Sequence, residues 1–327
     1  MEGQQSPQIS QIEQMPQRKR RRSPWLFIGC GGLGCLVLVL GALFLAGMFV
    51  HLSGGIGGRI ALVRVEGVIT GSAGGFLEGG ANSDRLVRVL RKVARDANVG
   101  AVVLRVDSPG GSAAGSQEIY DEILHVKKAG KPVVVSMGDV AASGGYYVSC
   151  AADKIIASPG TITGSIGVIM SAPELSGLLK KIGWNEQVIK SGPHKDMGSF
   201  ARPLTPEEKK IVQDLINDIY DQFVTAVVEG RTGKLTRAQV VRLADGRVYT
   251  GRQAKKLGLV DDLGNIRYAI REAARLGGLR EGAAVVEYGR AGLLDVLLGG
   301  LAESRSPFRR AGLLYSPLAD SLVRSLQ

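Results

Sequence analysis

The chain has few cysteines, histidines and aromatic residues for its length. It contains 327 residues, of which three are cysteine, three are histidine and 5% are aromatic. Three cysteines cannot build a disulfide framework, which excludes a small disulfide-stabilised scaffold. Cys30 and Cys35 fall in a strongly apolar segment, and Cys150 follows a helical pattern that predicts a packed core thiol.

One segment has no charged residue at all. From Trp25 to Val50 there is no Asp, Glu, Lys or Arg, and these roughly 26 residues can cross a bilayer core of about 30 Å. Buried core helices rarely continue so far without a charge, and the apolar region of a cleaved signal peptide is usually only about 7 to 15 residues long. We therefore predict an uncleaved transmembrane anchor over residues 25–50.

Positive charge is concentrated just before this anchor. The formal net charge is +11, and residues 18–22 are all Arg or Lys. Because such residues stay on the cytoplasmic side, we predict a disordered cytoplasmic tail at 1–24 and an external position for all that follows residue 50. The other positive charges are scattered and lack an aromatic-rich basic patch, which argues against a nucleic-acid partner.

Apolar and turn-forming segments alternate beyond a Gly-rich linker at 51–58. The run at 99–106 is broken only by Arg105 and indicates a buried parallel strand. The alternation predicts parallel crossover units, and so an α/β domain at 59–289 with an apolar tail of unknown role at 290–327. Further strands are predicted at 59–68, 132–136, 154–157, 166–170 and 187–190, and helices at 173–182, 205–229, 250–257 and 265–276.

Three loops contain residues that can do chemistry. The turn at 107–111 follows the buried strand and has two adjacent glycines, whose amides can form an oxyanion hole, although Pro-Gly turns are common. Ser143 stands between small residues at a strand-to-helix turn, where its hydroxyl is either an exposed nucleophile or a helix cap. Lys195 lies in the loop at 191–198, and most lysines in such loops are simply solvated.

A serine nucleophile needs a base. His51 borders the predicted anchor, so a Ser-His-Asp triad is possible only through His125 or His194. A Ser-Lys dyad through Lys195 is the other arrangement, and it requires a neutral lysine, which burial favours. The sequence shows no metal-ligand cluster and no nucleotide-binding loop, so no cofactor is predicted.

Five motifs occur in an order and spacing that together are specific. They are at 107–111, 142–146, 163–168, 191–196 and 246–262. Over residues 59 to 280 the chain resembles the signal peptide peptidase A family, also called protease IV, in its short single-copy form. The resemblance implies a ClpP/crotonase-type fold of repeated ββα units. It also implies a serine endopeptidase that cleaves residual signal peptides and other apolar peptides outside the bacterial cytoplasmic membrane.

The resemblance implies a role for each motif. Ser143 matches the nucleophile, Lys195 matches the general base, and Ser165 matches the serine that orients the lysine. The resemblance to short-form members implies that the serine and the lysine of one active site come from neighbouring subunits. It thus implies a ring-shaped homo-oligomer. The oxyanion turn and its second donor correspond to Gly110, Gly111 and Gly144.

Two functions of other classes remain open on the sequence. An acyl-CoA-type enzyme of crotonase fold would use a similar oxyanion turn but needs no Ser143, and the predicted external topology argues against it. A non-catalytic scaffold that binds apolar segments needs neither Ser143 nor Lys195. A ClpP-like histidine triad is disfavoured because the first histidine after Ser143 is His194.

Overall fold

The computed structural model describes residues 38–45, 58–71 and 80–289. The chain divides into two units, residues 1–56 and 57–327. In the first unit residues 38–45 are helical. The remainder of the predicted tail and anchor, most of the linker and the tail at 290–327 lie outside the described residues. Among the described helices, none is both long enough and apolar enough to span a membrane.

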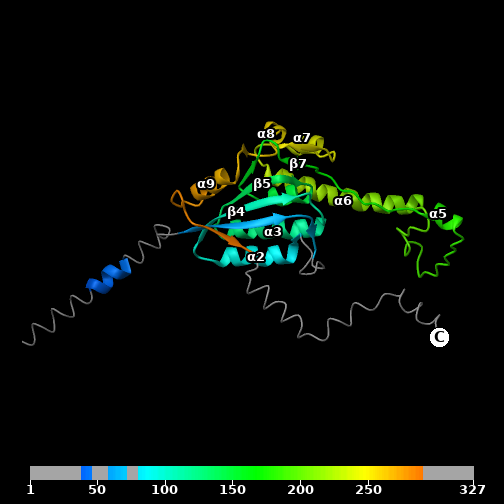
Figure 1. Ribbon diagram of the computed structural model, residues 1–327, viewed down its shortest axis with the longest axis horizontal. Coiled ribbons are helices and arrows are strands. Elements are labelled where there is room, and N and C mark those ends of the chain that lie inside the picture. Colours follow the sequence, from blue (N-terminus) through cyan, green and yellow to red (C-terminus); the bar gives the residue numbers. More distant parts are fainter. Residues whose placement is uncertain (1–37, 46–57, 72–79, 290–327) are drawn as a thin grey trace, which may run out of the picture. The chain divides into compact units, whose positions relative to one another are not determined.

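The second unit is built on one mixed sheet (Figure 1). Its main path is β10-β1-β4-β5-β6-β9, and every neighbouring pair along this path is parallel. A side branch pairs β7 parallel to β5 and antiparallel to β8. The α/β class predicted from the sequence is therefore confirmed. The strands are β1 (Arg59–Glu66), β2 (Ile69–Thr70), β3 (Ala81–Asn82), β4 (Val99–Ser108), β5 (Val133–Ala142), β6 (Lys154–Ala157), β7 (Ile162–Gly164), β8 (Val248–Thr250), β9 (Asp262–Leu263) and β10 (Val285–Tyr288).

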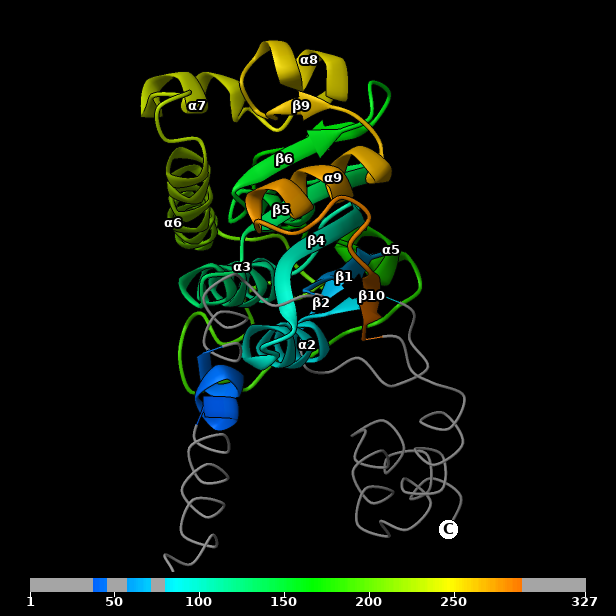
Figure 2. The ribbon, with the colours of Figure 1, turned by 90° about the vertical axis from the view of Figure 1, so that its left-hand side faces the viewer.

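Helices cover both faces of the sheet. Leu86 of α2 and Ile119 of α3 belong to the larger core, while Ala269 and Ala273 of α9 belong to a second core on the other face. Figure 2 shows α9 lying across β4 and β5, on the opposite side from α3. The helices are α2 (Ser83–Arg95), α3 (Ala113–Lys128), α4 (Gly144–Ser149), α5 (Ser176–Lys181), α6 (Pro206–Gly230), α7 (Arg237–Leu243), α8 (Gly251–Lys256) and α9 (Ile266–Leu276).

Strand β4 lies between the two helix layers and is buried on both faces. Val102, Leu104 and Val106 enter the larger core, and the alternate residues Ala101 and Val103 enter the second. Successive side chains of a strand point to opposite faces, so a strand between two helix layers needs a continuous apolar run. The predicted buried parallel strand at 99–106 is confirmed, and it ends directly at the turn 107–111.

Helix α6, predicted over 205–229, begins with a capping box. The Glu208 amide donates to Thr205 Oγ1 at 3.1 Å, and Glu208 Oε2 accepts from the Thr205 amide at 2.9 Å. Pro206 is the first helical residue, where its missing N–H costs no helical bond. This start places 25 residues in one helix, of which only the second half is packed on the larger core.

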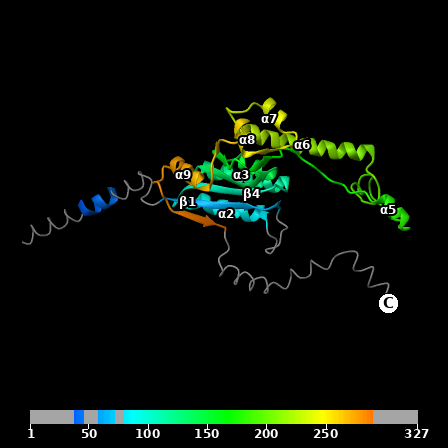
Figure 3. The same ribbon diagram turned by 45° about the horizontal axis from the view of Figure 1, so that its top comes forward.

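Residues 167–207 form a segment that we call the arm, and it has no core of its own. All of these residues are described, and none of them is buried. Figures 1 and 3 show the part that contains α5 beyond the N-terminal end of α6, away from the sheet. Several large apolar side chains of the arm are exposed, among them Ile169 at 91% and Ile189 at 100%. Such exposure is unusual for a monomeric protein.

Two predicted strands are not strands. Residues 166–170 and 187–190 are irregular. The first run begins just after Ser165, whose φ of 50° turns the backbone out of the β7–β8 ladder. The second lies in the exposed arm. An apolar run forms a strand only where a neighbouring strand can pair with it, and the described residues provide no such partner here.

Candidate active site

Ser143 occupies a strained turn between β5 and α4. Its φ is 52° and its ψ is −124°, a conformation that costs a non-glycine residue about 1 to 3 kcal/mol. Its amide donates to the Gly164 carbonyl at 2.8 Å, which ties the turn to the end of β7. Gly144 opens a helix, so its amide has no intrahelical acceptor. The turn thus presents a hydroxyl beside an unpaired amide.

The glycine turn after β4 packs directly against Ser143. Gly110 has a φ of 97°, and a Cβ there would lie 2.6 Å from the Gly144 nitrogen and 2.7 Å from Ser143 Cβ. The Gly110 amide donates to Ser108 Oγ at 3.1 Å. The bonds to Ile69 are made by the Gly110 carbonyl and the Ser112 amide, so the Gly111 amide points away from Ile69. Of the two glycines, Gly111 is therefore the one whose amide is not used within the turn.

Ser165 lies at the end of the neighbouring strand. It is the second non-glycine residue with positive φ among the described residues. Its amide donates to the Arg247 carbonyl at 2.8 Å, which fixes it against the segment before β8. Ser143 and Ser165 line the same groove, so the structure brings together two of the three side chains that the sequence singled out.

This groove has a volume of about 930 Å³ and is lined by five parts of the chain. They are the turn at 109–111 with the start of α3, the Ser143 turn with the start of α4, Ser165 with residues 167–170, the middle of α6, and the loop at 244–246. Tyr147 bridges the turn and α6, because its ring centroid lies 5.0 Å from that of Phe223. The apolar side chains from α6 and the arm are Val168, Ile169, Met170, Ile216, Ile219, Tyr220 and Phe223.

The sequence did not predict that α6 forms a wall of the groove. Its apolar residues come in pairs at helical spacing, a pattern that also fits ordinary core packing. Groove and core share this part of the helix: Ile216 and Ile219 line the groove, Val224 is buried in the larger core, and Phe223 does both. Only the fold reveals this division.

Lys195 is not among the residues that line the groove. It lies on the arm, with its side chain exposed to solvent. His194 beside it approaches Glu207, with 3.7 Å between Nε2 and the carboxylate. His125 is exposed on α3, and neither histidine lines the groove. Within one chain, therefore, the groove holds both serines but none of the bases that the sequence offered.

Comparison with known proteins identifies the family. The model of peptidase family S49 matches residues 125–280. A putative protease of Synechocystis sp. is 43% identical over 221 residues, which cover 68% of this chain and 75% of that protein. The chain belongs to peptidase family S49. A putative signal peptide peptidase SppA of Enterococcus faecium is 40% identical over 232 residues, 70% of this chain and 67% of that protein.

Among solved structures, a variant of the 1510-N membrane-bound stomatin-specific protease in complex with a substrate peptide is similar. Its TM-score is 0.46 and its sequence identity 16%, over 76% of this chain and 99% of that chain. The family membership makes this chain a serine protease. The resemblance and the enzyme class expected from the five motifs are thus confirmed, in preference to an acyl-CoA-type enzyme or a non-catalytic scaffold.

Other reactive groups in this S49 peptidase lie away from the groove. Cys150 is buried at 1% exposure as predicted, and burial raises the pKa of its thiol to about 12, so it stays protonated. No group of His, Cys, Asp and Glu suited to a metal ion occurs in the part of the chain that the structure describes.

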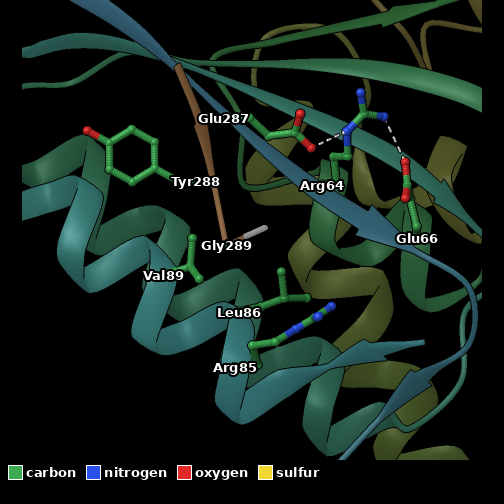
Figure 4. A pocket seen from close by; sticks show the side chains of 8 residues that line it. All are labelled: Arg64, Glu66, Arg85, Leu86, Val89, Glu287, Tyr288 and Gly289. Carbon is green, nitrogen blue, oxygen red and sulfur yellow. Dashed lines mark hydrogen bonds and ion pairs between the residues drawn. The ribbon is translucent and has the colours of Figure 1, made fainter. Parts of the chain in front are cut away.

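A second hollow, of about 340 Å³, lies between β1, β10 and α2. In Figure 4 Arg64 lies between Glu66 and Glu287 there, at 2.8 Å from each carboxylate. None of the residues that the sequence singled out lines this hollow. The groove with Ser143 is therefore the candidate active site.

Proposed function

We propose that this chain is a Ser-Lys endopeptidase whose nucleophile is Ser143. The observation that carries the proposal is the strained Ser143 turn, which presents a hydroxyl beside backbone amides in a groove of about 930 Å³ that is lined in part by apolar side chains. Strained serine turns between a strand and a helix are a means of exposing a nucleophile. The proposed fold is of the ClpP/crotonase type, as the resemblance implies.

The proposed reaction has two halves. Ser143 Oγ attacks the peptide carbonyl carbon while Lys195 Nζ takes the hydroxyl proton, and the oxyanion accepts hydrogen bonds from the Gly111 and Gly144 amides. The C–N bond then breaks, and the lysine gives its proton to the leaving amine. Water attacks the acyl-enzyme with the lysine again taking a proton, and Ser143 is regenerated. Ser165, on the same groove wall, is placed to orient the lysine amine.

The role of Gly110 follows from its packing and gives a testable prediction. Gly110→Ala places a methyl group within 2.7 Å of Ser143 Cβ and 2.6 Å of the Gly144 nitrogen, so the nucleophile and an oxyanion donor must both move. We expect kcat/KM for an apolar peptide to fall by about 10²-fold or more, since misplacement of about 1 Å has that effect.

Gly130→Ala is the matched control for Gly110→Ala. Gly130 also has a positive φ, of 80°, but a Cβ there meets nothing within 4 Å. Both variants carry the same kind of backbone strain, so both should lose some thermal stability. Equal activity in the two variants would show that close packing at Gly110 does not serve the reaction.

The proposed substrates are apolar peptides bound in an extended form. The groove has a volume of about 930 Å³, and Ile216, Ile219 and Phe223 of α6 give it apolar side chains, which suits side chains such as those of a signal peptide core. The related Enterococcus faecium protein bears the name of a signal peptide peptidase. Cleaved signal peptides are therefore the natural substrates that we propose.

The proposed base comes from a neighbouring copy of the chain. Asp196, next to Lys195, is joined through Arg202 to Glu208 at the start of α6, whereas Phe223 lines the groove near Tyr147. Fifteen helical residues separate Glu208 from Phe223, or about 22 Å along the axis, several times the length of a lysine side chain. The exposed apolar side chains of the arm also suit burial against another protein surface.

A mixing experiment tests this arrangement. Ser143→Ala and Lys195→Ala are each expected to be inactive, but a co-assembled equal mixture should regain activity at roughly a quarter of the sites. This fraction follows because an active site needs an intact serine from one chain and an intact lysine from the next. The measurement is turnover of a fluorogenic apolar peptide after the chains are unfolded together and refolded. If both singles are inactive and the mixture also stays inactive, the lysine acts within its own chain.

The cellular position that we propose follows the charge pattern of the N-terminus. The apolar segment 25–50 would anchor the protein once in the bacterial cytoplasmic membrane. The basic residues 18–22 would hold the N-terminus in the cytoplasm, with the peptidase domain outside. Because each chain would supply its lysine to the active site of the next chain, a closed ring of copies is the assembly that we propose.

A further inference from the structure

A chain of ion pairs joins the Lys195 loop to the start of α6. Asp196, the residue after Lys195, accepts hydrogen bonds from Arg202 Nε at 2.9 Å and Arg202 Nη2 at 2.7 Å. Its Oδ1 also accepts from Lys190 Nζ at 2.6 Å. The carboxylate beside the lysine is therefore held by a two-pronged guanidinium pair, the geometry in which Arg-carboxylate pairs are strongest.

The same guanidinium makes a second two-pronged pair with α6. Arg202 Nη1 donates to Glu208 Oε2 at 2.8 Å, and Nη2 donates to Glu208 Oε1 at 2.7 Å. Nη1 also donates to the Pro203 carbonyl at 3.1 Å. Glu208 in turn closes the capping box with Thr205. Asp196, Arg202 and Glu208, which we call the clamp, thus link the lysine loop to the first turn of a 25-residue helix.

Burial distinguishes the clamp from ordinary surface pairs. Glu208 is 1% exposed, and it is the first buried residue after Ile166. Hydrogen bonds from Arg202 and then from the Thr205 amide lower the pKa of Glu208 to about 2. Those from Arg202 and Lys190 lower the pKa of Asp196. Both carboxylates therefore stay ionised, and the clamp stays intact, at neutral pH.

We propose that Asp196, Arg202 and Glu208 are positioning residues that hold Lys195 at a fixed place relative to α6. This inference rests on the proposed function, in which Lys195 is the base. The arm has no buried apolar residue to fix its loops. The clamp therefore fixes them, as a hydrophobic core does in other parts of the fold. Helix α6 also forms a wall of the groove in its own chain. In the proposed assembly the clamp therefore fixes the base for a neighbouring chain's active site on the same helix that lines the groove of its own chain.

The experiment compares Arg202→Met and Arg202→Lys in the whole chain. Both remove the two-pronged pairs, and the lysine variant keeps the charge but cannot bind both carboxylates in a planar fork. We expect kcat for a fluorogenic apolar peptide to fall by about 10²-fold in Arg202→Met, with KM changed less than about twofold, because the base is misplaced while the groove is intact. Arg202→Lys should recover only a small part of this loss.

A matched control lies one turn further along α6. Lys210 and Asp214 form an exposed pair at 2.7 Å, with side chains 75% and 61% exposed. Asp214→Asn removes an ion pair from the same helix without touching the clamp, and it should leave kcat and KM at wild-type values. Thermal unfolding of every variant gives the folded fraction, so that kcat is counted per folded chain.

Two results would overturn the inference. One is a kcat per folded chain in Arg202→Met within about twofold of wild type, which would make the clamp merely structural. The other is full recovery of kcat by Arg202→Lys, which would show that charge alone is needed. Lys195→Ala separates this question from the proposed function. If that variant keeps wild-type turnover, the dyad itself is wrong, whereas an inactive Lys195→Ala beside an active Arg202→Met rejects only the clamp.

Discussion

Ser143→Ala is expected to lower kcat by at least about 10⁴-fold. In the proposed reaction no acyl-enzyme forms without Oγ, and the groove and the amides of Gly111 and Gly144 would provide only binding and charge stabilisation. KM should change little, because the hydroxyl contributes to the reaction more than to substrate binding. The measurement is steady-state cleavage of a fluorogenic apolar peptide by the whole chain.

Ser149→Ala provides the matched control for this substitution. Ser149 lies on the same short helix, but its hydroxyl donates to the Gly145 carbonyl at 2.7 Å and is fully buried. That variant should keep turnover within a few-fold of wild type. A serine-directed organophosphorus probe should label wild type at the peptide that contains residue 143 and should not label Ser143→Ala. Turnover of Ser143→Ala above about 1% of wild type would assign the nucleophile elsewhere.

The second large effect is on stability. Asp261→Asn is expected to lower the free energy of unfolding by about 3 to 5 kcal/mol, because it leaves Arg231 buried without its counter-charge. Arg231 is 1% exposed and donates to both Asp261 oxygens, at 3.1 Å and 2.5 Å. Asp261 Oδ2 also accepts from the Ile155 amide at 2.7 Å. The pair therefore joins the C-terminal end of α6 to the sheet.

The same pair gives stability a defined dependence on pH. Burial alone would raise the pKa of Asp261, but hydrogen bonds and charge from Arg231, with help from Lys234, lower it to about 2. A carboxyl group with a depressed folded-state pKa adds stability above its unfolded pKa of about 3.9, and this stability is lost as the pH falls toward 2. Wild type should therefore lose stability between about pH 4 and pH 2 more steeply than Asp261→Asn.

An exposed pair serves as control for these unfolding measurements. Asp221 and Arg237 form an ion pair with side chains 66% and 48% exposed. Asp221→Asn should change the free energy of unfolding by less than about 1 kcal/mol, since exposed pairs contribute little. Chemical denaturation at pH 7 measures both variants. Equal destabilisation by Asp221→Asn and Asp261→Asn would mean that burial does not increase the contribution of the Arg231–Asp261 pair to the free energy of unfolding.

Much of the scaffold could be predicted because local chemistry and burial agree there. The capping box at Thr205, the continuous apolar run of β4 and the helix over 265–276 are each set by residues close in sequence. The edge strand β10 and the short strands β7 and β8 were not predicted. They are only three or four residues long, and β10 and β8 pair with strands more than 80 residues away, while β7 lies between β5 and β8, which no local pattern reveals.

The candidate site was predicted in composition but not in arrangement. Ser143 and the glycine turn are recognisable because each follows a predicted strand, and parallel strands end at the same edge of a sheet. Ser165 was singled out only through the family resemblance. The distance of Lys195 from the groove is not visible in spacing, since the arm runs along α6 in the fold. The clamp was also missed, because Asp196, Arg202 and Glu208 look like ordinary surface charges until Glu208 is seen to be buried.

The positive φ angles of Ser143 and Ser165 have an evolutionary consequence. Glycine adopts such angles without cost, so a glycine at either position would relax the backbone and make the chain more stable. It would also remove the hydroxyl that the proposed reaction needs. Selection for robustness and selection for turnover therefore favour different residues at these two positions. A lineage that no longer needed the protease would be expected to drift toward glycine there first.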